Sequence, residues 1–142
     1  MKKIGLDFHG VIDKEPELWS FLTENLIEKG YEIHIITGHE NNEKFRAELK
    51  SLNIVWTHLF SIISYHKSIG TPVTYDKNGD PWIDEEIWNK SKAEYCKKEN
   101  IDIIIDDSKI YEKYFNNCST FYISFEMFKQ LMEMIINGKI KG

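Results

Sequence analysis

Four groups of polar or charged side chains are of the types that bind a metal ion and a phosphate. They are Asp7, Thr37, Lys92 and the neighbouring pair Asp106 and Asp107. Carboxylates that converge on one point repel one another unless a cation lies between them, and such oxygen ligands suit Mg²⁺. An ionised carboxylate beside a metal ion and a lysine can act as a nucleophile toward phosphorus. These residue types predict a Mg²⁺ site with phosphoryl chemistry if the fold brings them together.

Three of the four groups directly follow apolar segments that predict β-strands. These segments are residues 3–6, 31–36 and 101–105. Ligands of open parallel sheets bind beyond the carboxyl ends of the strands, so we expect these side chains along one edge of a sheet. Lys92 lies in the first turn of a helix that the capping-box sequence Ser91-Lys92-Ala93-Glu94 predicts.

Strand-like and helix-like segments alternate along the chain. This order predicts an α/β fold, a Rossmann-like three-layer sandwich with a mostly parallel, five-stranded sheet. The two remaining strands are predicted at residues 53–58 and 120–124. Helices are predicted at residues 15–29, 42–52, 91–99, 110–115 and 125–136, with a short helix at residues 84–89.

The region of about residues 60–90 has a different pattern. The turn sequence Asp76-Lys77-Asn78-Gly79-Asp80-Pro81 separates two short strand-like pieces and predicts a hairpin. We expect this region to be a small insertion or flap within a single domain of residues 1–142.

Composition excludes several classes of protein. The chain has a net charge of −5 and lacks a dense run of Lys and Arg, which argues against extended nucleic acid as a partner. Two cysteines indicate no disulfide framework and suit a reducing compartment. No segment has the length and apolarity of a membrane span. We therefore expect a cytoplasmic protein with no membrane partner.

The order of the motifs resembles that of the haloacid dehalogenase (HAD) superfamily. The matching segments are Asp7-Phe8-His9-Gly10-Val11, Ile35-Ile36-Thr37-Gly38, Lys92 near a helix start, and Ile103-Ile104-Ile105-Asp106-Asp107. Together they span residues 4 to 108 in the order that the superfamily shows. The resemblance implies a HAD-like fold and a hydrolase that removes phosphate from monoesters, with Mg²⁺ as cofactor.

The resemblance also assigns roles around the metal ion. Asp7 would be the nucleophile and a Mg²⁺ ligand, and His9 would offer its backbone carbonyl. Asp107 would bind the ion directly, and Asp106 directly or through water.

Further roles concern the phosphate. Thr37 and the Gly38 backbone N–H would bind the phosphoryl oxygens. His39 directly follows them in the sequence and is assigned to the substrate site on that ground, with a histidine of a surface loop as the alternative. Lys92 would neutralise the negative charge on the nucleophile and the phosphate.

One departure from the superfamily pattern concerns His9, which stands where its phosphatases carry a second Asp. Histidine can act as a general acid and base near neutral pH. The alternative is that this position supplies only its backbone carbonyl. Two other functions therefore stay open: a catalytically impaired protein that binds metal and phosphate, and a phosphotransferase.

The insertion is too short for a full cap domain, which predicts an open site. An open site suits a phosphorylated small molecule or a larger phosphorylated substrate, or it takes a lid from another subunit of a homo-oligomer. His34 is predicted to be a core histidine with a partner. For four further side chains, packing is the expectation and lining of a pocket the alternative: His58, His66, Trp82 and Trp88.

Overall fold

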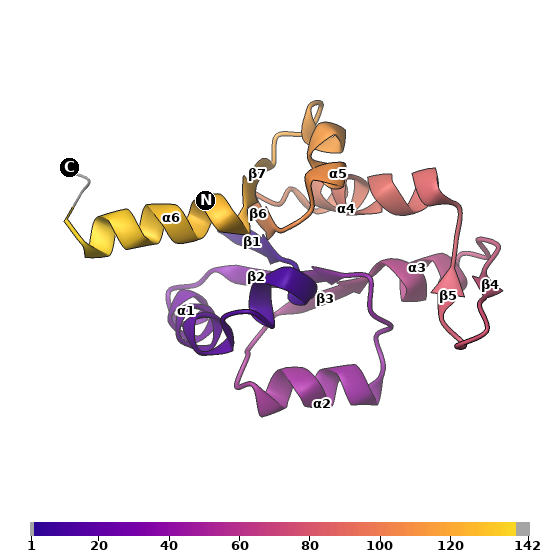
Figure 1. The fold of residues 1–142 in the computed structure, drawn as a ribbon, viewed down its shortest axis with the longest axis horizontal. Helices are drawn as coiled ribbons and strands as arrows, with labels where there is room; N and C mark the ends of the chain where they lie inside the picture. The colour runs from indigo at the N-terminus through magenta and orange to yellow at the C-terminus, as the bar shows by residue number, and fades with distance from the viewer. Residues whose placement is uncertain (1, 139–142) are drawn as a thin grey trace.

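The computed structural model describes residues 2–138 and has a five-stranded parallel sheet at its centre (Figure 1). The strand order is β3-β2-β1-β6-β7. The strands are β1 (Lys3–Leu6), β2 (Glu32–Thr37), β3 (His58–Ser61), β6 (Ile103–Asp106) and β7 (Phe121–Ser124). Helices cover both faces of this sheet, so the predicted α/β sandwich is confirmed.

Two apolar clusters hold the helices against the two faces of the sheet. Helices α1 (Pro16–Glu28) and α2 (Glu43–Ser51) and the start of α6 (Phe125–Ile136) pack on one face. The opposite face carries α4 (Glu85–Glu99), α5 (Lys109–Glu112) and the 3₁₀ turn η2 (Lys113–Phe115). Figure 1 shows α1 and α2 below the sheet and α4 and α5 above it, with α6 extending to one side.

Alternation along the strands divides the side chains between these clusters. Ile33 and Ile35 of β2 contribute to the first cluster, whereas Ile36 belongs to the second. A period of two is what a strand buried on both faces requires. Gly5 of β1 lies close to Ile36, where an added Cβ would come within 2.7 Å of the Ile36 side chain.

The strand predicted at residues 53–58 is wrong over most of its length, because β3 begins at His58. Asn53 has a φ of 58°, and the Ile54 N–H donates to the Leu49 carbonyl at 3.0 Å. These contacts close the end of α2 and direct the chain into a connection. The apolar Ile54 is buried in the first cluster without belonging to a strand.

The prediction of two helices between residues 84 and 99 is also wrong. Helix α4 is continuous, and Asp84 caps it by accepting from the Ile87 N–H at 3.2 Å. Ser91 is no cap, since its hydroxyl donates to the Ile87 carbonyl within the helix at 2.5 Å. Lys92 therefore lies in the middle of α4 and not in a first turn.

The insertion contains the predicted hairpin and a helix that the sequence did not predict. Strands β4 (Thr74–Tyr75) and β5 (Pro81–Trp82) pair antiparallel, and α3 (Ile62–Ser68) precedes them. The hairpin lies beyond α3, at the end of the molecule away from α6 (Figure 1).

Helix α6 has the predicted bounds but packs less than its sequence suggests. Phe128 stacks on Trp19 of α1, with 5.3 Å between the ring centroids. Leu131 and Ile135 of its apolar face are 46% and 54% exposed. Among the described residues, no helix is both long and apolar enough to cross a bilayer.

Candidate active site

The aspartates predicted from the sequence meet where two central strands end. Asp7 directly follows β1, Asp106 is the last residue of β6, and these strands are neighbours. The chain leaves β1 toward β2 on one side and later continues from β6 to β7 on the other. Such a reversal of strand order opens a crevice for ligands. Carboxylate oxygens of Asp7, Asp106 and Asp107 lie within 4.8 Å of one another.

Lys92 joins the two strand ends from the helical layer above. Its Nζ lies 3.0 Å from Asp7 Oδ1 and 2.7 Å from Asp106 Oδ2. The three side chains are 4%, 8% and 0% exposed, respectively. A buried charge is tolerated only when it is paired, so this triad is a constrained electrostatic unit.

The charges of this unit do not cancel, since Lys92 faces two carboxylates with Asp107 nearby. Burial raises the pKa of Asp7 well above its usual value, and the charge of Asp106 adds to the effect although Lys92 opposes it. Burial alone would lower the pKa of Lys92, but Asp7 and Asp106 outweigh it and the net pKa is raised. A protonated lysine beside an excess of negative charge favours binding of a further cation.

Asp106 and Asp107 differ in what surrounds their carboxylates. Asp106 accepts from Lys92 through Oδ2 and from the Ser108 backbone N–H through Oδ1, at 3.0 Å for the latter. Asp107 is exposed and lines the cavity described below. Asp106 thus anchors Lys92, whereas Asp107 has its carboxylate toward the open side of the site.

The turn after β1, η1 (Phe8–Ile12), brings the backbone close to Asp107. Gly10 has a φ of 85°, and a Cβ built there would lie 1.9 Å from Asp107 Oδ2. Only glycine fits both the backbone conformation and the space.

His9 extends from this turn into the cavity, with a side chain that is 80% exposed. Its Nδ1 lies 3.2 Å from Asp13 Oδ2, and Asp13 Oδ1 accepts from the Gly10 N–H at 2.7 Å. Asp13 is not among the site residues predicted from the sequence. Its spacing of four residues from His9, on a tight helical turn, was the available signal.

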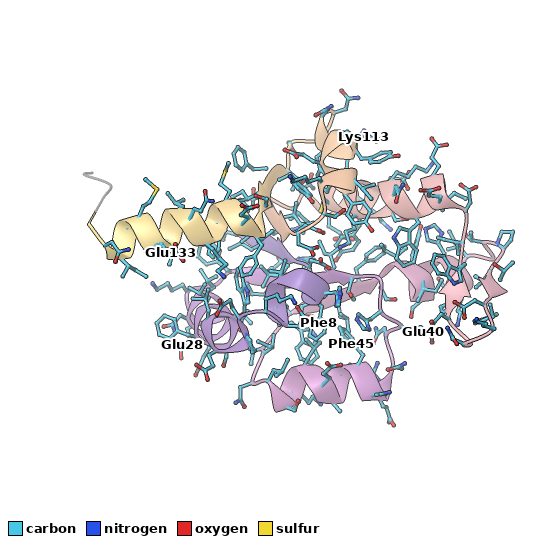
Figure 2. All side chains as sticks on the ribbon, viewed as in Figure 1. Phe8, Glu28, Glu40, Phe45, Lys113 and Glu133 are labelled. Carbon is cyan, nitrogen blue, oxygen red and sulfur yellow. The ribbon has the colours of Figure 1, made fainter. Side chains whose placement is uncertain are left out.

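Thr37, Gly38 and His39 lie at the end of β2, beside β1. Thr37 is buried, and its Oγ1 accepts from the His39 N–H at 3.2 Å. A Cβ on Gly38 would come within 2.7 Å of the Trp88 ring, so this position must stay small. The His39 ring stacks on Phe45 of α2 at 4.9 Å. Phe45 also packs edge-on against Phe8, with ring centroids 5.1 Å apart, and both residues are labelled in Figure 2.

A cavity of about 800 Å³ connects these groups. Of the predicted site residues, those that line it are Asp7, His9, Thr37, Gly38, His39, Lys92 and Asp107. Asp106 lies beneath them, fully buried. The turn of the hairpin forms part of the wall through Gly79–Pro81.

Trp88 takes the alternative role of lining this cavity, and its indole N–H donates to the Tyr111 hydroxyl at 2.9 Å. Trp82, in contrast, is 60% exposed and donates to Asp76 within the hairpin. The prediction that both tryptophans pack in the core is therefore wrong for Trp82 and only partly right for Trp88.

The three other histidines lie outside this cavity. His34 is buried between Tyr95 and Glu32, as predicted for a core histidine. His66 is buried too and bonds Thr71 and Ser91. His58 is half exposed and stacks on His34.

Comparisons with known proteins identify the fold and no family. No family model and no curated protein matches the sequence. An uncharacterised protein from Corynebacterium glutamicum is similar in structure, with a TM-score of 0.56, 15% identity and coverage of 100% of this chain and 98% of that chain. A glycosyltransferase from Rickettsia africae has a TM-score of 0.50 at 14% identity, over 87% of this chain and 29% of that chain.

A third similar structure is the cobalt-bound deoxy-D-mannose-octulosonate 8-phosphate phosphatase from Haemophilus influenzae. Its TM-score is 0.48 at 12% identity, over 87% of this chain and 68% of that chain. At such low sequence identities, these comparisons support the α/β fold of this chain and say nothing about its activity.

Proposed function

We propose that this protein is a Mg²⁺-dependent phosphomonoester hydrolase of the HAD type, with Asp7 as its nucleophile. The observation that carries the proposal is the buried Lys92, which pairs with Asp7 and Asp106 at the ends of two neighbouring parallel strands. The order of the sequence motifs supports the same function.

The side chains present fit a hard divalent cation, since three carboxylates converge with one lysine among them. We assign Asp7, Asp107 and the His9 backbone carbonyl as the ligands of Mg²⁺. Asp106 pairs with Lys92 and would also contact the ion, either directly or through a water molecule. The ion would supply neutralisation of the negative charge on the phosphate.

In the proposed reaction, an Asp7 carboxylate oxygen bonds to phosphorus while the bond from phosphorus to the leaving oxygen breaks. The leaving oxygen takes a proton from a general acid. Water then attacks the phosphorus of the aspartyl-phosphate, returns a proton to that group and releases Asp7 and inorganic phosphate. Lys92 stays bonded to Asp7 Oδ1 and stabilises the charge that develops there.

Thr37 and Gly38 would bind the transferred phosphoryl group. The Thr37 Oγ1 already accepts from the His39 N–H, so its own hydroxyl hydrogen remains to donate to a phosphoryl oxygen. The Gly38 N–H would supply a second donor, and His39 would contact the substrate from the cavity wall.

His9 is the proposed general acid and base, with Asp13 as its positioning residue. The Asp13 carboxylate contacts Nδ1 of His9 and is itself held by the Gly10 N–H. This leaves the other ring nitrogen of His9 for proton transfer. A histidine held by a carboxylate is a recurrent arrangement for acid–base work.

We further propose that residues 1–142 act as one domain whose insertion, residues 60–90, forms a low wall rather than a cap. Its hairpin turn contributes Gly79–Pro81 to the cavity. Such a site suits a phosphorylated small molecule and leaves room for a larger phosphorylated substrate.

The decisive experiment measures phosphate release from a panel of phosphomonoesters with Mg²⁺. Asp7→Asn should lower kcat/KM by about a thousandfold or more, because it removes the nucleophile. The exposed Glu24→Gln of α1 is the matched control for loss of one carboxylate. Asp7→Asn should unfold at an equal or higher temperature, since burial and Asp106 already disfavour the Asp7 charge. Full activity in Asp7→Asn would contradict the proposal.

Variants at His9 separate the hydrolase from its alternatives. Activity that His9→Ala greatly reduces supports His9 as acid and base. An inactive parent that becomes active as His9→Asp identifies an impaired metal- and phosphate-binding protein. Release of the leaving group that depends on an added alcohol acceptor identifies a phosphotransferase.

A further inference from the structure

A second group of metal-ligand side chains lies near the amino ends of β2 and β3, at the opposite end of the strands from the aspartates. Ligand atoms of Glu32, His34 and His58 lie within 4.8 Å of one another. Glu32 and His34 share one face of β2 because side chains alternate along a strand. His58 of β3 is the register partner of His34. The sheet itself therefore brings the three side chains together.

His34 is already oriented as a ligand would be. Its ring is fully buried, with Nδ1 at 2.7 Å from the Tyr95 hydroxyl and Nε2 at 2.8 Å from Glu32 Oε1. Histidines that bind metal ions usually hold their other ring nitrogen in a hydrogen bond that fixes the tautomer. Tyr95 can play that part, since burial raises the pKa of its phenol and keeps it a neutral hydroxyl.

In neutral His34 the Nε2–H donates to the Glu32 carboxylate, and a cation that binds Nε2 takes the place of this proton, which moves to Nδ1 and is donated to the Tyr95 oxygen. Burial lowers the pKa of His34, although its hydrogen bond with Glu32 works against this. The hydrogen bond with His34 lowers the pKa of Glu32, which therefore stays ionised. A neutral imidazole and a carboxylate thus face each other at a distance close to that between two ligands of one ion.

His58 and Glu32 have the freedom to complete the site. The rings of His34 and His58 stack at 4.1 Å with an angle of 3° between their planes, so their lone pairs lie in parallel planes. A metal ion lies in the plane of each imidazole that binds it, so His58 must turn out of the stack. Its side chain is 48% exposed and that of Glu32 is 38% exposed. The His58 Nδ1 lies 2.8 Å from the Thr57 hydroxyl and 3.7 Å from Glu32 Oε1, so binding of an ion through this nitrogen replaces its contact with Thr57.

We propose that Glu32, His34 and His58 bind one Zn²⁺ ion, which ties the edge strand β3 to β2. Two imidazoles and a carboxylate are a common zinc ligand set, with bonds of about 2.0–2.2 Å, and they leave a position for water. Nitrogen ligands also distinguish this site from the oxygen-only aspartates, which suit Mg²⁺. The edge strand β3 pairs only with β2 in the sheet, so a cross-link there has an evident structural effect. This proposal does not depend on the hydrolase.

The test titrates metal-free Asp107→Asn protein, in which the aspartate site is weakened, with Zn²⁺ in a calorimeter. We expect one equivalent to bind and the thermal unfolding midpoint to rise. Co²⁺ in place of Zn²⁺ should give the visible absorption bands of nitrogen-ligated cobalt. Adding His58→Ala should weaken Zn²⁺ binding at least about tenfold and remove the gain in thermal stability.

Two further variants complete the test without replacing His34, whose buried side chain could be needed for folding. Glu32→Gln should weaken Zn²⁺ binding as His58→Ala does. His39→Ala, which removes an exposed histidine outside the cluster, should leave the Zn²⁺ affinity unchanged. If His58→Ala and His39→Ala bind Zn²⁺ alike, the binding is adventitious and the proposal is wrong. It is also wrong if the parent takes up no Zn²⁺ at micromolar concentrations.

Discussion

At the scale of single residues, Lys92 determines the electrostatics of the candidate site. It is the cation that the structure pairs with both strand-end carboxylates, and all three side chains are buried. Removing one partner of a buried ion pair leaves the other charge without compensation, which costs far more than the pair gains. The lysine is therefore as important for folding as for the proposed chemistry.

Lys92→Met should lower the free energy of unfolding by about 3–5 kcal/mol in metal-free buffer. Urea denaturation measures this value. Lys90→Met, two residues away on α4, is the matched control, because Lys90 is 44% exposed and its pair with Glu94 lies at the surface. Adding Asp7→Asn to Lys92→Met should recover part of the loss, since one uncompensated charge disappears. Equal losses for the two lysines would contradict this account of the triad.

Gly10 is the residue that allows Asp107 to approach the turn after β1. Gly10→Ala should cost about 1–2 kcal/mol from its positive φ and should also displace the Asp107 carboxylate. Gly30→Ala is the control, since Gly30 has a φ of 89° but no heavy atom within 4 Å of an added Cβ. Gly10→Ala should lose at least as much stability as Gly30→Ala, because it adds the contact with Asp107 to the cost of the positive φ. Only Gly10→Ala should raise the Mg²⁺ concentration needed for half-maximal activity. The same Mg²⁺ dependence in both variants would show that Asp107 is not a ligand.

At the scale of elements, His66 connects α3 to α4, the helix that carries Lys92. From α3 it bonds Thr71 and reaches Ser91 of α4, at 2.9 Å in each case. Burial lowers the pKa of His66 below its ordinary value of 6.5, although the charge of Glu94 opposes this. Ser91, which resembled a helix cap in the sequence, instead contributes to this connection.

The His66 pKa predicts how stability depends on pH. The folded protein keeps His66 neutral, whereas the unfolded chain binds a proton as the pH falls through about 6.5. The free energy of unfolding is thus unaffected by His66 above that pH, and it falls below that pH as the unfolded chain takes up the proton. His66→Gln should flatten the decline in unfolding free energy between about pH 7 and 5, measured by urea denaturation. His34, whose pKa is also lowered, should account for part of the decline that remains. An unchanged slope in His66→Gln would contradict the prediction.

At the scale of the whole molecule, the hairpin forms its own small sheet and does not extend the central one. β4 and β5 pair with each other in a two-stranded sheet of their own, while the other strands form the parallel sheet. Tyr75 and Trp82 of the hairpin are 57% and 60% exposed. The hairpin therefore adds a wall to the cavity without being part of the core.

Replacing residues 73–83 by a short Gly-Ser linker should change the free energy of unfolding by no more than about 1 kcal/mol. The same change should raise KM for small phosphomonoesters, because Gly79–Pro81 no longer line the cavity. The KM for large phosphorylated substrates should rise less. The measurements are thermal unfolding and steady-state kinetics, and collapse of the fold would show that the hairpin is part of the core.

Much of the fold could be predicted from local sequence, because apolar periodicity and the residues that end strands and helices are local properties. Asp7, Thr37 and Asp106 were placed at strand ends from short segments alone. The limits of β3 and the continuity of α4 could not be predicted in this way. Asn53 closes α2 in a left-handed conformation, and Asp84 rather than Ser91 caps α4.

The sequence by itself determined which side chains end the central strands, since each lies beside the apolar segment that forms its strand. Only the tertiary structure decided which of these side chains meet. Lys92 is 14 residues from Asp106 and 85 from Asp7 along the chain, and packing of α4 on the sheet brings it to both. The contact between His9 and Asp13 and the stack of His34 on His58 likewise depend on backbone direction and strand register. Both are set by the packing of the whole chain, which no short segment contains.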